Sequence, residues 1–230
     1  MAFISAEDDC LTVLNLFGAK SAAAQERLLT TMRGIIDSAD YPGWISSTLF
    51  GGVAAHGTAN YIQWRSAEDL QNRYHGEKFQ RETVPLFNEL STAIRLLQTE
   101  VVFIRTHPSS DAVEIGPDRD LLTVIAVMGV APADQQELVD LFAQTDEWVT
   151  RLPGYRSNSI LRGTDGTVVV NFAQWDSEAD YHAFHTLPEQ ERPADVQRMR
   201  ARARSLLTSH EFNTYRPVHT RSADPAATRS

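Results

Sequence analysis

The sequence predicts an α+β chain built from two copies of one βαββαβ unit. Three observations lead to this prediction: a residue pattern that occurs twice at constant spacing, short apolar runs that alternate with amphipathic segments, and an ordinary globular composition. Of the 230 residues, 42% are hydrophobic and 22% are charged, close to the average for globular domains. A chain of this length can form two domains, each with its own core.

The repeat is visible as a constant shift of 111 residues along the chain. Under this shift the following positions correspond: Leu11-Thr12-Val13 and Leu122-Thr123-Val124, Pro42-Gly43-Trp44 and Pro153-Gly154-Tyr155, Asn60-Tyr61-Ile62-Gln63-Trp64 and Asn171-Phe172-Ala173-Gln174-Trp175, Ser66 and Ser177, Asp69 and Asp180, Glu100 and Glu211, Arg105 and Arg216. One gap-free offset that relates segments spread over nearly the whole unit indicates a duplication.

Each unit is expected to begin with a strand and a helix. In the first copy, residues 11–17 form a short apolar run with β-branched side chains, typical of a buried strand. Residues 21–39 follow with apolar side chains at helical spacing, which predicts an amphipathic helix. Pro42-Gly43 then ends this helix and turns the chain.

The rest of the unit is expected to contain a hairpin, two helices and a last strand. In the first copy these elements are strands at residues 45–50 and 58–64, a capped helix start at Ser66, a helix at 84–97 and a strand at 101–105. Gly163-Thr164-Asp165-Gly166 is the hairpin turn of the second copy. Ser66 and Ser177 are each followed three residues later by an acid, as in helix N-caps. The order βαββαβ is the ferredoxin-like arrangement.

The domain organisation follows from these units. We expect a first ferredoxin-like domain at residues 1–106, a linker at 107–120, a second such domain at 121–219 and a disordered tail at 220–230. Helices on one face of each sheet leave the other face bare, and packing the bare faces together buries both. The fused repeats would then form an intramolecular dimeric α/β-barrel with a shared interior, in which side chains at the strand ends line small-molecule cavities.

Charge and cysteine content exclude several classes of protein. The formal net charge of -9 disfavours nucleic acid or an anionic membrane as a partner. The single cysteine, Cys10, cannot form an internal disulfide. We find no signal peptide and no apolar run of about 20 residues that would span a bilayer. These features predict a cytoplasmic protein that binds neither nucleic acid nor membrane.

The segment from Asn171 to Tyr181 resembles the corresponding stretch of the antibiotic biosynthesis monooxygenase family, in particular the small anthrone oxygenases of aromatic polyketide pathways. Pro153-Gly154-Tyr155 lies where that family has a Pro-Gly-aromatic turn. The resemblance extends over both repeats, at residues 11–105 and 122–216. It implies a monooxygenase that uses O2 to convert an anthrone or phenol to a quinone, or to open a ring of an angucycline-type polyketide.

The resemblance also implies a set of site residues. The anthrone oxygenases use an Asn, a Trp four residues later, a Tyr six residues after that Trp, and an Arg on the following helix. By spacing, the first three correspond to Asn171, Trp175 and Tyr181. Arg198 corresponds to the fourth if a short insertion precedes it.

The first copy is less complete. It retains Asn60 and Trp64, but Leu70 stands where the second copy has Tyr181. We therefore expect the C-terminal copy to hold the main catalytic site, with Asn60, Trp64 and Tyr155 contacting the substrate.

These residue types suit the reaction of an electron-rich aromatic with O2. That reaction is slow unless a metal, a flavin or the substrate itself supplies electrons, and a deprotonated anthrone can supply them. The enzyme then needs an apolar cavity, donors for the developing oxyanion and a proton acceptor. Asn171, Trp175 and Arg198 offer donors, and Tyr181 can pass a proton. His185, whose ordinary pKa is near neutral, is the candidate general base.

Two cofactor requirements are compatible with the sequence. The substrate can supply all electrons, so that no cofactor is required besides O2. Alternatively, reduced flavin (FADH2 or FMNH2) can act as a diffusible cosubstrate, as in the ring-opening oxygenases that fused two-repeat chains resemble. No Gly-x-Gly-x-x-Gly segment follows a strand, so a resident dinucleotide is not expected.

Each candidate also has a structural interpretation. The tryptophans can be core residues that end strands, the asparagines can satisfy buried backbone groups, and Tyr181 can serve packing alone. Arg198 belongs to an Arg-rich segment that fits a solvated helix face. His182 and His185 are three residues apart, but no further ligand accompanies them, so no metal site is predicted.

Two other functions stay open at this point. Heme-degrading monooxygenases share this fold and use an Asn–His–Trp triad, which neither copy carries whole. The first copy has Tyr74 at the His position, and the second has Ala126 at the Asn position. The other alternative is a non-catalytic ligand-binding module, because ferredoxin-like folds host many functions. The sequence also leaves open whether two fused chains pair as a homodimer.

Overall fold

Two similar series of strands and helices follow one another in the computed structural model, which describes residues 2–77, 79–110, 112–144 and 147–223. The first series is β1 (Ala2–Ile4), β2 (Leu11–Gly18), α1 (Ala22–Asp37), β3 (Trp44–Gly52), β4 (Gly57–Trp64), α2 (Ala67–His75), a π-helical turn (Phe79–Thr83), α3 (Val84–Leu90) and β5 (Ala93–Thr106). The second is β6 (Val113–Ile115), β7 (Leu122–Val130), α4 (Gln135–Ala143), α5 (Glu147–Thr150), β8 (Tyr155–Gly163), β9 (Val168–Trp175), α6 (Glu178–Thr186), α7 (Ala194–Leu206) and β10 (Leu207–Ser222), with 3-10 turns at Pro117–Arg119, Pro132–Asp134 and Glu189–Glu191.

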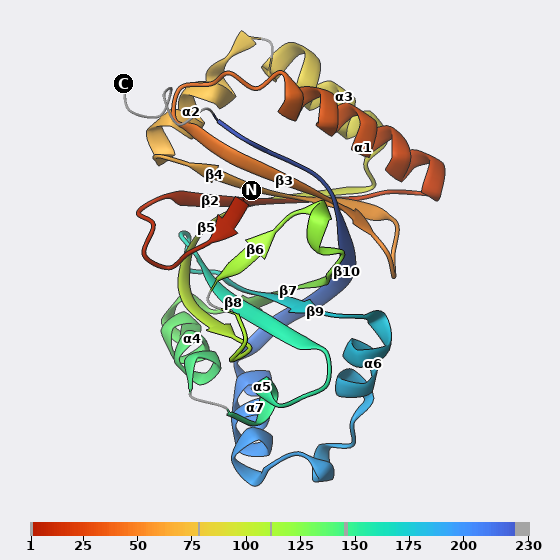
Figure 1. Cartoon of the computed structure of the whole chain (residues 1–230). Coiled ribbons are helices and arrows are strands. Elements are labelled where there is room, and N and C mark those ends of the chain that lie inside the picture. The colour runs from red at the N-terminus through yellow and green to blue at the C-terminus, as the bar shows by residue number, and fades with distance from the viewer. Residues whose placement is uncertain (1, 78, 111, 145–146, 224–230) are drawn as a thin grey trace.

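Eight of the strands close into one barrel, in the order β10-β3-β4-β2-β5-β8-β9-β7. Helices α1, α2 and α3 lie at one end of the molecule and α4 to α7 at the other, with the strands between them (Figure 1). The predicted class is confirmed: two ferredoxin-like repeats form an intramolecular dimeric α/β-barrel.

The last strand of each repeat links the two sheets. β5 pairs first with β2 and then with β8, while β10 pairs first with β7 and then with β3. The units that we propose at residues 1–106 and 121–219 therefore share one barrel. β10 extends to Ser222, so residues 220–222 of the expected tail belong to a paired strand, and residues 224–230 lie outside the described part of the chain.

The two sheets face each other across a filled core. Phe50, Tyr61 and Phe172 are fully buried there, and the ring centroid of Phe172 lies 5.8 Å from each of the other two, in edge-on contacts favourable for aromatic rings. Aliphatic side chains from both repeats, such as Leu14 and Val170, complete the core. This corrects one expectation, because side chains occupy the shared interior, and a cavity lined by Asn171 and Trp175 lies on the other face of a sheet.

The repeated Pro-Gly turn packs against a helix cap in both copies. In the second copy, Ser177 Oγ accepts the backbone N–H of Asp180 at 3.1 Å, as predicted for an N-cap. Gly154 has φ of 71°, and a Cβ there would lie 2.4 Å from the Asp180 side chain. Gly43 and Asp69 stand in the same relation in the first copy. Both turns require glycine, because the backbone has a positive φ there and a Cβ would collide with the Asp side chain.

The last helix of the first unit is shorter than the sequence predicts. The helix expected over residues 84–97 is wrong in extent, since α3 ends at Leu90 and β5 starts at Ala93. Residues 93–99 pair with β2 in the barrel. This pairing overrides the helix propensity of the segment, which is weak compared with tertiary hydrogen bonding.

The expected linker at residues 107–120 contains a strand that the sequence did not predict. β6 pairs with β1, with Phe3 opposite Glu114. The Gln63 side-chain amide donates to the Phe3 carbonyl at 3.2 Å, and that of Gln174 donates to the Glu114 carbonyl at 2.9 Å. The glutamine of the repeated Asn-x-x-Gln-Trp motif therefore has a structural role, which is to hold this two-stranded ribbon.

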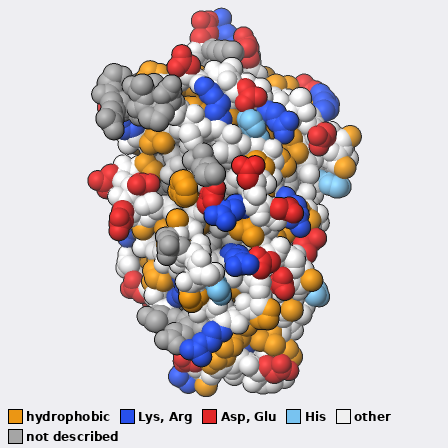
Figure 2. All heavy atoms as spheres, in the orientation of Figure 1, with side chains coloured by type: hydrophobic (Ala, Val, Ile, Leu, Met, Phe, Trp, Pro, Cys, Tyr) orange, Lys and Arg blue, Asp and Glu red, His pale blue; other side chains and the backbone are white. Residues whose placement is uncertain are grey.

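Charged side chains of both signs are interspersed over the face of the molecule shown in Figure 2. A protein that binds the nucleic-acid backbone concentrates Lys and Arg in a stripe. On this face, the described side chains form no such stripe. The described helices are all too short or too polar to cross a bilayer.

Candidate active site

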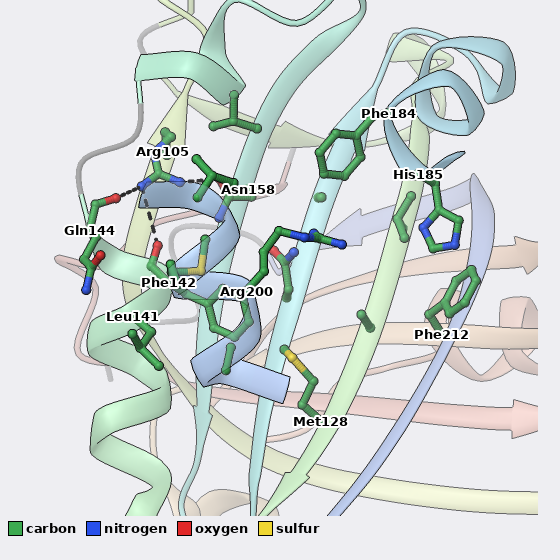
Figure 3. A pocket seen from close by; sticks show the side chains of 18 of the residues that line it. Arg105, Met128, Leu141, Phe142, Gln144, Asn158, Phe184, His185, Arg200 and Phe212 are labelled. Atoms are coloured by element: carbon green, nitrogen blue, oxygen red, sulfur yellow. Dashed lines mark hydrogen bonds between the residues drawn. The ribbon is translucent and has the colours of Figure 1, made fainter. Parts of the chain in front are cut away.

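A cavity of about 340 Å³ lies between the outer face of the C-terminal sheet and helices α4, α6 and α7. Its volume is typical of pockets that enclose a small organic molecule. Most of its lining is apolar or aromatic (Figure 3). Among the polar side chains at its surface are Arg105, Asn158, Asn171, Tyr181, His185 and Arg200.

Strand alternation explains which residues of β9 reach this cavity. Val170 and Phe172 belong to the barrel core, whereas Asn171, Ala173 and Trp175 line the cavity. Successive side chains of a strand point to opposite faces of the sheet. The Asn and Trp of the repeated motif are four residues apart and therefore share the cavity face.

Trp175 is the centre of an aromatic cluster at the end of β9. It is 2% exposed, and its ring stacks on Phe184 with centroids 5.1 Å apart. The edges of Tyr155 and Tyr181 approach it, with centroid distances of 5.6 Å and 5.9 Å. The cluster fixes one wall of the cavity, where the partly exposed rings of Tyr181 and Phe184 can contact an aromatic ligand.

Two asparagines offer amide groups to the cavity. The Oδ1 of Asn171 is buried and has no hydrogen-bond partner among the described residues. Such an atom costs free energy unless a ligand or water satisfies it. Asn158 is satisfied, because its Oδ1 accepts from Tyr155 Oη at 2.7 Å and from Arg105 Nη1 at 3.4 Å. A ligand hydroxyl can therefore donate to Asn171, while Asn158 positions its two neighbours.

Tyr181 and His185 form a pair on α6. They are one helical turn apart, and Tyr181 Oη lies 3.5 Å from His185 Nδ1, a distance at the upper limit for a hydrogen bond. Burial raises the pKa of Tyr181, so the phenol is protonated at neutral pH. The pKa of His185 is lowered, first by desolvation and then by the positive charges of Arg200 and Arg192. The imidazole is therefore neutral at pH 7 and able to accept a proton.

The cationic residue near this pair differs from the one expected. Arg198 lies on the exposed face of α7 and does not line the cavity, whereas Arg200 does. Arg200 Nε lies 3.4 Å from Glu189 Oε2. This corrects the assignment of Arg198, because a helix turns about 100° per residue and two positions change the face presented. Arg192 is buried nearby and donates to the Phe184 carbonyl at 2.8 Å.

The first copy has a much smaller cavity at the matching place. It measures about 80 Å³ and is lined by both Asn60 and Trp64. Arg73 fills part of the space, with its guanidinium 4.3 Å from the Tyr41 ring centroid and 4.6 Å from that of Phe79. The structure thus brings Asn171, Trp175, Tyr181, His185 and Tyr155 into one cavity and places Asn60 and Trp64 in another.

The first copy has Asn15, Tyr74 and Trp64 at the positions of the heme-degrading Asn–His–Trp triad. In the first copy, Asn15 and Trp64 share the small cavity, and Tyr74 rather than His75 lines it beside them. In the part of the chain that the structure describes, no group of three or more His, Cys, Asp or Glu side chains is arranged to hold a metal. His182 lies on the exposed side of α6.

Asn158, Arg200 and Arg105 line the cavity but were not singled out from the sequence. Asn158 lies on β8 just after a register shift in its pairing with β9, and such a bulge leaves no local signal. Arg200 was one of several arginines on one helix. Arg105 had a signal, since it is repeated as Arg216, but its approach to the cavity depends on β5 crossing between the sheets.

Comparison with known proteins gives the following relatives. The antibiotic biosynthesis monooxygenase family matches residues 121–194. The tetracenomycin-F1 monooxygenase of Streptomyces glaucescens is 38% identical over 106 residues, which are 45% of this chain and 95% of that protein. The crystal structure of an anthrone oxidase-like protein is 41% identical, with a TM-score of 0.91 over 96% of both chains. A structure from Fusobacterium nucleatum is 7% identical, with a TM-score of 0.61 over 93% of this chain and 94% of that chain, which shows a common fold.

Proposed function

The chain belongs to the antibiotic biosynthesis monooxygenase family, and on this basis we propose that its C-terminal cavity oxidises a polycyclic aromatic polyketide of the anthrone type to a quinone. The enzyme is a monooxygenase of the antibiotic biosynthesis type. The observation that carries the proposal is the convergence of Asn171, Trp175 and Tyr181 on one aromatic-walled cavity of about 340 Å³. The similarity to a tetracenomycin-F1 monooxygenase supports a substrate of several fused rings.

The overall reaction needs no reductant other than the substrate. A ring CH2 and one O2 become a ring C=O and one H2O, so the carbon supplies all four electrons that reduce oxygen. The substrate must first lose a proton, because its anion gives up electrons far more readily. The enzyme therefore contributes proton transfer, positioning of the substrate and stabilisation of negative charge.

The Tyr181–His185 pair is suited to the proton transfer. As the substrate CH2 gives its proton to Tyr181 Oη, the phenol proton passes to His185 Nδ1, which is 3.5 Å away. The imidazolium later returns this proton to the peroxide formed from the carbanion and O2. Loss of water from that hydroperoxide gives the carbonyl, and both Tyr181 and His185 regain their starting forms.

The other residues bind the substrate and stabilise charge. Phe184, on which the buried Trp175 ring is stacked, presents an aromatic surface to the substrate rings, and the free Oδ1 of Asn171 accepts a hydrogen bond from a phenolic hydroxyl. Arg200 brings a positive charge to the cavity, near the place where negative charge develops. We propose a small aromatic molecule as the partner of this site, with neither nucleic acid nor a membrane involved.

Oxygen consumption tests the proposal. With dithranol as substrate, the purified chain should consume O2 well above the autoxidation rate of enzyme-free buffer, and the product should be the anthraquinone. Uptake that depends strictly on reduced flavin would instead assign the ring-opening reaction, in which the substrate does not supply all electrons. No uptake with dithranol or with a tetracyclic naphthacenone, with or without flavin, would contradict an oxygenase of this substrate class.

A further inference from the structure

Arg105 brings a positive charge to the C-terminal cavity from the N-terminal repeat. It lies near the end of β5, opposite Asn158 in the pairing with β8. Its side chain is half-buried and lines the cavity. Figure 3 shows Arg105 at one side of the cavity and His185 at the other, so the two residues face different parts of a ligand.

The contacts of Arg105 are with neutral groups. Nη1 donates to Asn158 Oδ1 at 3.4 Å, and Nη2 donates to the carbonyls of Phe142 and Gln144, with the Phe142 distance 3.5 Å. The guanidinium also stands 5.0 Å from the Phe103 ring centroid. Among the described residues, it makes no ion pair with a carboxylate and its Nε–H has no acceptor. The end of α4 supplies about half a negative charge at most, so part of the positive charge is unbalanced.

The repeat supplies a natural comparison. Arg216, which corresponds to Arg105 in the second copy, has a carboxylate partner: its Nη1 lies 2.7 Å from Asp120 Oδ1 at the protein surface. The other cations around the cavity are also compensated, because Arg200 and Arg204 share Glu189 at 3.4 Å and 3.3 Å. Arg105 is the arginine of the cavity that lacks an acid among the described residues.

We propose that Arg105 binds a carboxylate carried by the substrate, at the side of the cavity away from the Tyr181–His185 pair. The inference rests on the proposed function and narrows its substrate class to a polycyclic aromatic acid. The positive guanidinium attracts a carboxylate, its Nε–H is unused among the described residues, and its backbone contacts hold it in place before the ligand arrives. The carboxylate fixes the orientation of the rings, so that the carbon to be oxidised lies near Tyr181.

Binding of two matched probes to the full chain tests this without turnover. Anthraquinone-2-carboxylate and its methyl ester differ in charge, and neither has a ring CH2 to oxidise. Trp148 and Trp175 line the cavity, so quenching of tryptophan fluorescence reports both affinities. The wild-type chain should bind the carboxylate more tightly. Arg105→Gln should weaken carboxylate binding about ten- to a hundredfold and ester binding less than about threefold.

Two further variants make the result specific. Arg216→Gln removes the corresponding arginine of the other repeat and should leave both affinities unchanged. Arg105→Lys keeps the positive charge but lacks the planar guanidinium, so it should retain part of the preference for the carboxylate. Equal wild-type affinity for the two probes would overturn the proposal. So would an equal loss of both in Arg105→Gln, which would show that Arg105 only anchors the end of α4.

The outcome is separable from that of the oxygenase assay. Dithranol is neutral, so its oxidation tests the reaction and not the anion site. Carboxylate preference without any oxygen uptake would leave Arg105 as an anion-binding residue and contradict the reaction. Oxygen uptake without carboxylate preference would support the reaction and contradict the role of Arg105 in binding a carboxylate.

Discussion

Side chains at a few corresponding positions leave a cavity of about 340 Å³ in the second repeat and one of about 80 Å³ in the first. His185 and Phe184 of α6 correspond to Tyr74 and Arg73 of α2 under the shift of 111 residues. Arg73 and Tyr74 both line the small cavity of the first copy, and their side chains fill space that is open in the second copy. Tyr181, which corresponds to Leu70, adds a phenol where the first copy has a fully apolar side chain.

Conservative substitutions of the aromatic residues should separate the two copies. Tyr181→Phe removes the hydroxyl that passes the proton and should lower kcat about a hundredfold. Trp175→Phe removes an N–H donor and part of a stacking surface, and should lower kcat about tenfold. Trp64→Phe in the first copy should change kcat less than about twofold. Steady-state oxygen uptake measures all three, and a larger loss in Trp64→Phe would show that the main site is misplaced.

The pH dependence of kcat/KM should report His185. The base must be neutral, so activity should fall as the pH decreases through the pKa of His185, which lies below its ordinary value of 6.5. Arg200→Gln removes a nearby positive charge, which should raise this pKa and move the acid limb to higher pH. His185→Gln should abolish the limb. An acid limb that persists unchanged in His185→Gln would assign it to another group.

At the scale of the elements, most residues of the repeated motifs stabilise the fold. The Pro-Gly turn, the Ser N-cap and the capping Asp contact one another in both copies, as Gly154 and Asp180 do in the second. The Gln of the Asn-x-x-Gln-Trp motif holds the β1–β6 ribbon. The Asn and the Trp of this motif face the cavity of their own repeat.

Two glycine substitutions should have opposite effects on stability. Gly154→Ala places a Cβ against Asp180 at a positive φ and should lower the free energy of unfolding by about 2 kcal/mol or more. Gly34→Ala lies in α1 with nothing within 4 Å of the added Cβ, and should raise it by about 0.5–1 kcal/mol. Urea denaturation measures both. Equal stability of the two variants would contradict the account of the turn.

At the scale of the whole molecule, shared strands and a common core make the two repeats one folding unit. β5 and β10 each belong to both sheets, and Phe172 of the second repeat packs between Phe50 and Tyr61 of the first. Neither repeat can lose its structure without exposing the aromatic core of the other. We therefore expect a single cooperative transition.

Phe172→Ala should test this coupling. Phe172 is fully buried, so its truncation should cost about 3–5 kcal/mol, for the lost burial and the cavity left behind. The transition should shift to lower urea and remain single by both far-UV circular dichroism and tryptophan fluorescence. Leu96→Ala, at a side chain that is 50% exposed, is the control and should change stability by about 0.5 kcal/mol or less. Two separate transitions in Phe172→Ala would show independent domains.

The sequence by itself determined the duplication and the βαββαβ order within each repeat, and it singled out several residues that line the C-terminal cavity. The shift of 111 residues needs no structure to be seen. The resemblance to the anthrone oxygenases predicted that Asn171, Trp175 and Tyr181 lie together, and all three line one cavity. Strand alternation explains why Asn171 and Trp175 share a face of the sheet.

Only the tertiary structure decided which face of the sheet is hollow, where β5 begins, and that Arg105 and Asn158 reach the cavity. Alternation along a strand separates two faces but does not say which of them other elements will fill. That depends on contacts between segments distant in sequence, such as the crossing of β5 from one sheet to the other. For the same reason the sequence does not distinguish Arg200 from Arg198, because the face that a helix turns toward the cavity is set by what packs against it.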